Sequence, residues 1–202
     1  MSGALDPGAR PRRLVVGLTG SSAPQLGLAL LTALRDLPEV ETHLVVSKGA
    51  ELSLKLEAGV EKSEVEALAD TSYSSGDLGA AISSGSFETI GMVVMPCSMR
   101  SLAAIACGLT TDLVARAADV TLKERRKLVL VPRETPLNLI HIRNMETVTL
   151  AGAVVLPPVP AFYHRPKTID DLLAHLVGKV LDQFAIPHTL YRRWTGHSEN
   201  AG

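Results

Sequence analysis

The sequence predicts a three-layer Rossmann-like α/β fold, with a central parallel sheet and helices on both faces. Short apolar runs typical of strands alternate along the chain with amphipathic segments typical of helices. Strands that are covered on both faces are continuous apolar runs, and parallel strands need helical crossovers between them. Aromatic residues make up only 3% of the 202 residues, so we expect a core of leucine, valine, isoleucine and alanine.

One domain is expected, from residue 12 to residue 194. A chain of this length with 46% hydrophobic residues can bury one core of its own. Residues 1–11 lack the apolar core of a signal peptide. We expect them to form a flexible N-terminal tail. Residues 195–202 are polar without an apolar period and are predicted to form a loose C-terminal tail.

The charge balance and the cysteines narrow the class further. The chain has 20 Lys and Arg residues and 21 Asp and Glu residues, so its net charge is close to zero. This balance gives no reason to expect nucleic acid or a membrane surface as a partner. No apolar run approaches the roughly 20 residues that span a bilayer. Cys97 and Cys107 have the spacing of neither a zinc site nor a disulfide framework. We therefore expect a reduced cytoplasmic protein without a metal site.

The first half of the chain contains two predicted strand–helix pairs. Residues 14–18 form the first strand, which we place at the centre of the sheet, and a helix follows from Pro24. One face of that helix is apolar and Pro38 marks its end; the face consists of Leu26, Leu30, Leu34 and Leu37. Residues 43–46 form the second strand, and residues 48–58 a short helix with Leu52 and Leu56 directed inward.

The next segments complete the alternation. Residues 61–85 are irregular and serine-rich, so we expect a long loop with a short helix there, and loops of that length tend to be functional. The remaining elements are a strand at 91–95 ended by Pro96, a helix from Leu102 to Cys107, strands at 128–131 and 153–156, and helices at 137–150 and 170–184.

Two hydroxyl-rich turns follow predicted strands. Thr19 to Ala23 separates the first strand from its helix, and Ser98 to Ser101 follows Pro96. Backbone N–H groups and a helix dipole at such turns can hold a phosphate. The alternative is that the hydroxyls simply cap the helices. The turn at 19–23 does not have the GxGxxG pattern of NAD-binding proteins. Ser47 follows the second strand, where such proteins carry an acidic residue, so an NAD site is disfavoured.

Opposite charges stand at the end of the strand at 128–131. Arg133 and Glu134 lie between two prolines, and a cationic stretch at 116–126 precedes the strand. Open α/β sheets bind ligands at the carboxyl ends of their strands, so this pattern indicates a site for an anionic, phosphate-bearing ligand. The alternatives are a surface ion pair for Arg133 and Glu134, and a solvated face or subunit contact for the cationic stretch.

Taken together, separated motifs in this order closely resemble the UbiX-type flavin prenyltransferases, over about residues 12 to 194. The motifs are 19–22, 46–48, 82–87, 96–99, 116–126, 132–136 and 160–164. The resemblance implies a flavoprotein-like fold and an enzyme that transfers a dimethylallyl group from dimethylallyl phosphate to N5 and then C6 of reduced FMN, without a metal. The product, prenylated FMN, is the cofactor of UbiD-type decarboxylases. The family forms large oligomers, and a homododecamer is expected.

The resemblance also implies roles for individual residues. Ser22 and Glu134 match the proton relay, with Glu134 as the base, and Glu57 matches a further acidic position. The residues that match FMN-binding positions are Gly20, Ser21, Ser22, Ser47, Ser98, Met99, Arg100, Ser101 and Arg133. Arg116 and Lys123 match positions near the flavin or the prenyl phosphate, and Tyr163 and Lys179 match the pair that binds the dimethylallyl phosphate.

The chemistry fits these residue types. Cleavage of an allylic C–O bond leaves a phosphate whose charge Lys123, Arg133 and Lys179 can stabilise, and a dry cavity protects the carbocation from water. A tyrosine in the loop of Tyr163 is otherwise a packing residue, and His43 and His175 are interpreted as ordinary strand or helix residues. Ala23 and Pro24 stand where the family usually has glycine followed by alanine or glycine. Ala23 keeps the turn if its φ is negative, and Pro24 suits a first helical position, so we expect flavin binding to survive.

Two other functions are compatible with the fold. One is a flavin-dependent decarboxylase of the cysteine-decarboxylase group. Against it, the chain has no Pro-Ala-Ser-Ala-Asn-Thr-like segment and no histidine directly after the first strand. The other is an FMN-carrying accessory subunit of a decarboxylase. A mass measurement of the flavin after incubation with the prenyl donor distinguishes these functions from prenyl transfer.

Overall fold

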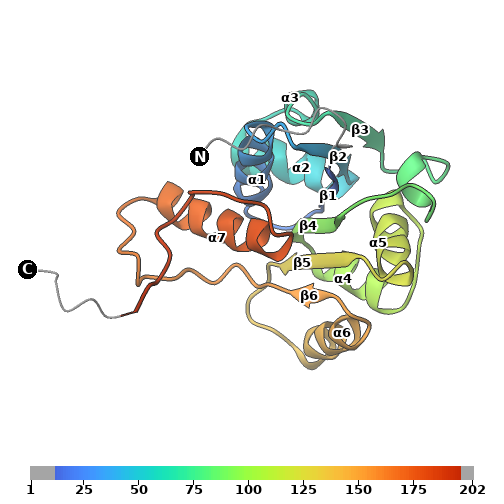
Figure 1. Ribbon diagram of the computed structural model, residues 1–202. Helices are drawn as coiled ribbons and strands as arrows, with labels where there is room; N and C mark the ends of the chain where they lie inside the picture. The colour runs from blue at the N-terminus through green and yellow to red at the C-terminus, as the bar shows by residue number, and fades with distance from the viewer. Residues whose placement is uncertain (1–11, 197–202) are drawn as a thin grey trace, which may run out of the picture.

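The computed structural model describes residues 12–196, which contain one parallel sheet in the order β3-β2-β1-β4-β5-β6 (Figure 1). The tail predicted at residues 1–11 and residues 197–202 of the second tail lie outside the described residues. The strands are β1 (Arg12–Leu18), β2 (Val40–Val46), β3 (Thr71–Ser74), β4 (Gly91–Cys97), β5 (Lys127–Pro132) and β6 (Val154–Val155). The central position predicted for the first strand is confirmed.

Helices cover both faces of the sheet, which confirms the three-layer prediction. α1 and α7 pack on one face, and α4, α5 and α6 lie over the other. The helices are α1 (Gln25–Arg35), α2 (Lys48–Ser53), α3 (Lys62–Glu66), α4 (Met99–Ala106), α5 (Leu113–Lys123), α6 (Leu139–Leu150) and α7 (Ile169–Gln183). A π-helical turn, η1 (Leu54–Ala58), continues α2, and a 3-10 turn, η2 (Ala81–Ser83), precedes β4.

The strand sequences are apolar throughout because both of their faces are buried. In β1, Val16 and Leu18 belong to the core beneath α1 and α7, whereas Val15 belongs to the core beneath α4 and α5. β4 divides in the same way, with Val93 on the first side and Val94 on the second. Successive side chains of a strand point to opposite faces, so each strand contributes to both cores.

α1 lies unusually close to the sheet at Gly27. A Cβ atom on this glycine would come within 2.7 Å of the carbonyl oxygen of Met95 and would also overlap the Leu18 side chain. Neither β4 backbone nor a fully buried leucine can move far in a close-packed core. The absence of a side chain at Gly27 therefore allows the start of α1 to lie directly against the sheet.

Residues 61–85 hold more regular structure than the long loop that was predicted. They contain α3, η2 and the edge strand β3, which pairs in parallel with β2. β3 reads Thr71-Ser72-Tyr73-Ser74 and its residues are only half-buried or exposed. Because an edge strand with one uncovered side needs no apolar run, the pattern that identified the other strands is missing here.

The inward face predicted for the helix at 48–58 is wrong. Leu52 is 59% exposed and Leu56 is 73% exposed, while Ala50 and Leu54 are buried. Both pairs have the i, i+4 spacing of one helix face, so the sequence pattern left the choice of face open. The smaller alanine at position 50 faces the core because the backbone of this segment runs close to the β1–α1 turn, as the Gly20–Gly49 contact described below shows.

Two other elements differ from the prediction. β4 continues through Pro96 to Cys97, and its register with β5 is irregular between Val94 and Cys97. Such an irregularity accommodates a proline, which has no N–H for the ladder. The cationic stretch at 116–126 lies largely in α5, to which no helix was assigned. α5 turns Ala117, Ala118 and Thr121 toward the core.

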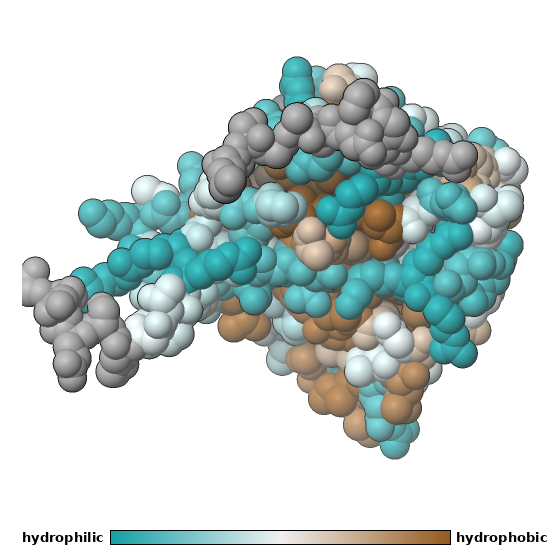
Figure 2. Space-filling view, viewed as in Figure 1, coloured by the Kyte–Doolittle hydropathy of each residue, from teal (hydrophilic) through white to brown (hydrophobic). Residues whose placement is uncertain are grey.

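α6 leaves an apolar surface exposed on the protomer. Of its residues only Val148 is buried, whereas four large side chains are more than half exposed: Leu139, Ile140, Ile142 and Leu150. Figure 2 shows hydrophobic residues gathered in the part of the view where Figure 1 places α6. Exposed apolar side chains gathered in this way are typical of a protein–protein contact. Within residues 12–196 no helix is long and apolar enough to cross a membrane.

Candidate functional site

A cavity of about 400 Å³ lies at the carboxyl ends of the strands. The turns that follow β1, β2, β3 and β4 border it, together with the turn before α5. Its lining residues are Gly20, Ser47, Lys48, Gly49, Ser75, Gly76, Ser98, Arg100, Ser101, Thr111 and Asp112. The chain connects β1 to strands on both of its sides, and such a switch point is where open α/β sheets bind ligands.

Polar caps bring helix N-termini to this cavity. Ser98 Oγ accepts a hydrogen bond from Ser101 N at 3.2 Å at the start of α4, and Asp112 Oδ1 accepts one from Ala115 N at 2.9 Å at the start of α5. Ser47 caps α2 in the same way. The N-terminus of a helix carries a partial positive charge and favours an anion. With Lys48 and Arg100 on its rim, the cavity is suited to a ligand that bears a phosphate.

The turn after β1 has a different role from the helix cap that was the alternative for it. α1 has Pro24 at its N-cap position and no side-chain cap hydrogen bond. Thr19 Oγ1 instead donates to Pro96 O at 2.9 Å and accepts from Ser98 N at 2.7 Å. Ser21 Oγ donates to Arg133 O at 2.8 Å. The hydroxyls of this turn thus tie together the ends of β1, β4 and β5.

Two glycines allow the turns after β1 and β2 to touch. A Cβ atom on Gly20 would lie 2.8 Å from both the Cα and the carbonyl carbon of Gly49, and one on Gly49 would lie 3.0 Å from Gly20 Cα. Real Cβ contacts are longer than the first of these distances. The floor between the two turns is therefore backbone packed on backbone, and both glycines line the cavity.

Ser22 pairs with Glu57 and not with Glu134, its partner in the relay implied by the resemblance. Ser22 Oγ donates to Glu57 Oε2 at 2.8 Å, and Ala23 N donates to the same oxygen at 3.0 Å. The hydrogen bond from Ser22, followed by the one from the Ala23 N–H, holds the pKa of the Glu57 carboxyl below its usual range. Glu57 therefore stays ionised and fixes the orientation of the Ser22 hydroxyl.

Glu134 lies at the end of β5, where its carboxylate is exposed. Its Oε1 accepts a hydrogen bond from Thr135 N at 3.0 Å, a contact within its own turn. Among the described residues no ion pair joins Arg133 to Glu134, so the surface ion pair considered as an alternative does not form here. Within residues 12–196 the Glu134 carboxylate is thus held only by the hydrogen bond of its own turn.

Ala23 adopts φ of +68°, so the negative φ on which its fit to the turn was made to depend is not found. The left-handed region costs a residue with a Cβ atom roughly 1–2 kcal/mol relative to glycine. We expect Ala23→Gly to raise the free energy of unfolding by up to about 1 kcal/mol, since part of the relief is offset by the greater freedom of glycine in the unfolded chain. Urea unfolding followed by circular dichroism measures the change.

The matched control for Ala23→Gly is Ala33→Gly, in the helical interior of α1. There glycine relieves no strain and should lower the free energy of unfolding by roughly 0.5–1 kcal/mol. Equal destabilisation by the two substitutions would show that the positive φ at position 23 carries no strain.

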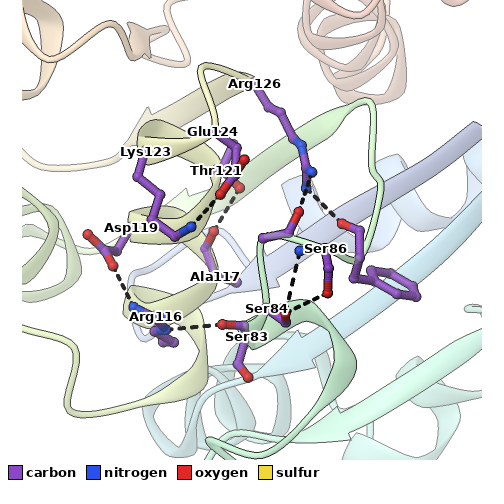
Figure 3. A network of polar contacts seen from close by, with 12 residues as sticks. Ser83, Ser84, Ser86, Arg116, Ala117, Asp119, Thr121, Lys123, Glu124 and Arg126 are labelled. Atoms are coloured by element: carbon purple, nitrogen blue, oxygen red, sulfur yellow. Dashed lines mark hydrogen bonds and ion pairs between the residues drawn. The ribbon is translucent and has the colours of Figure 1, made fainter.

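Arg116 and Lys123 lie on α5 and are not among the residues that line the cavity (Figure 3). Arg116 Nε donates to Ser83 O at 3.2 Å and its Nη1 lies 2.8 Å from Asp119 Oδ2, while Lys123 is paired with Glu124. Beyond the end of α5, Arg126 donates to the carbonyl oxygens of Gly85 and Phe87. In the protomer this cationic face holds the segment at 83–87 against α5.

Tyr163 and Lys179 are brought together by α7. The Tyr163 hydroxyl lies 3.1 Å from His175 Nε2, and His175 precedes Lys179 by one helical turn, so the two predicted ligands share a face of the helix. Lys179 Nζ lies 3.7 Å from Asp182 Oδ2. Within the described chain no hydrogen bond joins this pair to Ser22.

Asp182 anchors the segment that follows α7. It accepts hydrogen bonds from His188 Nε2 at 3.1 Å, from Tyr191 Oη at 2.6 Å and from Arg193 Nη2 at 2.6 Å. Burial alone raises the pKa of Asp182, but the hydrogen bonds from these three residues outweigh it and hold the pKa well below its usual range. The segment around Tyr191 is thereby held along α7, beside Tyr163.

Sequence reasoning missed part of the cavity lining, namely Lys48, Gly49, Ser75, Gly76, Thr111 and Asp112. Ser75 and Gly76 fell within the serine-rich loop that was expected to be functional, but because β3 was not recognised they were not assigned to the strand end where the cavity lies. Asp112 directly precedes the apolar period of α5, and this N-cap signal would have revealed it had that helix been recognised.

Comparisons with known proteins agree with this geometry. The family model described as Flavoprotein matches residues 6–181. The chain is 52% identical over 187 residues to the flavin prenyltransferase UbiX of Escherichia coli (strain K12), covering 92% of this chain and 99% of that protein. It is therefore similar to that enzyme over nearly the whole length of both.

Two solved structures are also similar. One is AnUbiX in complex with FMN and dimethylallyl pyrophosphate, with a TM-score of 0.91 and 53% identity over 94% of this chain and 100% of that chain. The other is the dodecameric FMN-dependent Ubix-like decarboxylase from Escherichia coli O157:H7, with a TM-score of 0.89 and 54% identity over 91% of this chain and 100% of that chain. Fold and sequence thus point to the same group of proteins.

Proposed function

Because the chain belongs to the UbiX-like flavin prenyltransferases, we propose that it transfers a dimethylallyl group from dimethylallyl phosphate to reduced FMN, forming prenylated FMN. The observation that carries this function is the cavity at the carboxyl edge of the sheet. Its rim is built from the hydroxyl turns that match flavin-binding positions, among them Gly20, Ser47, Ser98 and Ser101. The homology supports the same reaction over more than nine-tenths of the chain.

We assign the flavin to this cavity. Serine hydroxyls, helix N-termini and the cations of Lys48 and Arg100 suit the ribityl chain and phosphate of FMN. We assign Ser21 and Arg133 to the same ligand; neither is among the lining residues of the cavity, and the Ser21 hydroxyl donates to the carbonyl oxygen of Arg133. Met99 belongs to the turn between Ser98 and Ser101 that we assign to FMN. Reduced FMN supplies the nucleophilic N5 and C6 atoms when it is bound.

The prenyl phosphate is assigned to Tyr163 and Lys179 on α7, with Arg133, Arg116 and Lys123 as further cations. A departing phosphate gains negative charge, and preorganised donors and cations stabilise that charge. Tyr163 lies against His175, one helical turn before Lys179 on α7, and the two residues offer a phenol hydroxyl and an ammonium group. We infer that these groups close one donor site in the assembled oligomer.

Proton movement is assigned to Ser22 and Glu134. Formation of each new bond to the flavin requires that N5 or C6 lose a proton. Glu57 holds the Ser22 hydroxyl in place and, with its lowered pKa, accepts a proton poorly at neutral pH. Glu134 has no such anchor and is the base in this proposal.

We further infer that the chain assembles as a homododecamer, as the similar decarboxylase from Escherichia coli O157:H7 does. The exposed apolar surface of α6 supports a contact between subunits. Sedimentation equilibrium tests this assembly, and a stable active monomer would contradict it. The product would pass to a UbiD-type decarboxylase, and the enzyme would act in the cytoplasm.

The proposed function is tested by anaerobic incubation with reduced FMN and dimethylallyl phosphate. Mass spectrometry of the extracted flavin should show the addition of one C5H8 unit. A flavin-dependent decarboxylase or an FMN-carrying accessory subunit would return FMN at its original mass, and that result would refute the prenyltransferase function.

A further inference from the structure

His175 is buried on α7 and faces Tyr163. His175 is 5% exposed, and its Nε2 lies 3.1 Å from the Tyr163 hydroxyl. The His164 ring stacks on it at 4.8 Å with the planes 8° apart, and the Tyr191 ring lies 4.7 Å away on another side. The ring is therefore held in one orientation by its neighbours.

The other ring nitrogen of His175 identifies the tautomer. Nδ1 is buried and has no hydrogen-bond partner among the described residues. Burial lowers the pKa of His175, and the nearby His164 and Lys179 lower it further, so the imidazole is neutral and carries one proton. A buried N–H group without an acceptor is rarer and more costly than a bare lone pair. The proton therefore lies on Nε2.

This tautomer determines the direction of the hydrogen bond to Tyr163. The Nε2–H group donates to the phenol oxygen, which leaves the hydrogen of the Tyr163 hydroxyl free to donate elsewhere. Tyr163 is 42% exposed, so that hydrogen can reach a ligand. If the tautomer were reversed, the phenol would donate to the imidazole and present only lone pairs, which a phosphate oxygen does not bind.

We propose that His175 is a positioning residue that makes Tyr163 a hydrogen-bond donor to the phosphate of the prenyl donor. This inference rests on the proposed function and on the assignment of Tyr163 to the donor site. His175 itself does not touch the substrate in this proposal, and it acts through the direction of a single hydrogen bond.

The chain contains a matched histidine–tyrosine pair in another place. His43 on β2 is 3% exposed, and its Nδ1 lies 2.9 Å from the hydroxyl of Tyr73 on the edge strand β3. His43 and Tyr73 are not among the residues that line the cavity, and His43 also lies 3.1 Å from Glu41. Substitutions in this second pair report the cost of losing a buried histidine–tyrosine hydrogen bond as such.

Two amide substitutions separate the nitrogen positions of the ring. Glutamine places its amide nitrogen near the position of Nε2, and asparagine near that of Nδ1. At saturating reduced FMN, His175→Asn is expected to raise KM for dimethylallyl phosphate roughly 10-fold and also to lower kcat, because the bond to the phosphate holds the substrate and strengthens as the phosphate departs. His175→Gln should keep KM near that of the wild type.

Tyr163→Phe completes a double-mutant cycle. It is expected to raise KM for the prenyl donor by a similar factor, and the double variant Tyr163→Phe with His175→Asn should be no worse than Tyr163→Phe alone. His43→Gln lacks a nitrogen at the Nδ1 position that faces Tyr73, so it removes the hydrogen bond of the second pair. Neither His43→Gln nor Tyr73→Phe should change KM. The affinity for FMN, measured by quenching of flavin fluorescence, should be the same for every variant and shows that each of them is folded.

The outcomes distinguish this inference from the proposed function. If the wild type forms no prenylated FMN, the proposed function fails. If the wild type is active but His175→Asn keeps the wild-type KM, or if its effect adds fully to that of Tyr163→Phe, the positioning role of His175 is overturned. An equal rise in KM for His175→Asn and His175→Gln also overturns it, because packing and not the Nε2 donor would then be responsible.

Discussion

Glu134→Gln lowers kcat for prenyl transfer by roughly 100-fold or more, the usual range for loss of a general base, while the affinity for FMN stays unchanged. Glutamine has the shape of glutamate but does not accept a proton at neutral pH. The exposed Glu134 carboxylate takes part in one hydrogen bond within its own turn, from Thr135 N, so the substitution disturbs little else. Single-turnover reactions with reduced FMN, analysed by mass spectrometry, measure the rate.

Glu57→Gln is the comparison that separates a base from an anchor. Its carboxylate accepts hydrogen bonds from Ser22 Oγ and Ala23 N, and glutamine can still accept both through its amide oxygen. We expect a smaller loss for Glu57→Gln, on the order of 10-fold, because Ser22 is less firmly held. If Glu57→Gln were the slower variant and Glu134→Gln retained the wild-type rate, the two roles would have to be exchanged.

Gly20→Ala is expected to weaken FMN binding at least roughly 10-fold, because the substitution separates two turns of the cavity. The new methyl group would lie 2.8 Å from the Cα and carbonyl carbon of Gly49. Both turns are held by hydrogen bonds. Ser47 N donates to Leu18 O at 3.0 Å, and Thr19 Oγ1 donates to Pro96 O near the end of β4. Neither turn can yield without moving groups that line the cavity.

Gly79→Ala is the control for an added methyl group. The nearest atom to a Cβ at position 79 is Asp77 Oδ1 at 3.4 Å, an ordinary contact, and Gly79 does not line the cavity. Flavin fluorescence titrations should give Gly79→Ala the dissociation constant of the wild type. Unaltered binding by Gly20→Ala would mean that the two turns can separate without cost to the flavin site.

The sequence predicted most of the elements because most strands are buried on both faces. The apolar runs at 14–18 and 128–131 fall within β1 and β5, which carry core residues on either side. β3 escaped prediction because it is a polar edge strand held through its backbone. For the helix at 48–58, the spacing of Leu52 and Leu56 was correct but did not say which face the neighbouring turn would cover.

At the site, residues local to strand ends could be predicted and contacts between distant segments could not. Ser47 and Ser98 follow strands directly, and both line the cavity. The contact of Ser22 with Glu57 depends on where the turn η1 lies in space, which no local pattern specifies. The resemblance identified Glu57 as a candidate, and the structure shows that its partner is Ser22.

The two edges of the sheet restrict how copies of the protein can associate. β3 has four residues and is polar, and β6 has only two. A short or polar edge is a poor template for the addition of another strand, so neither edge favours continuation of the sheet into a second molecule. Stacking of subunits into an endless ribbon is thereby discouraged, and closed particles built through side-chain contacts between helices are favoured.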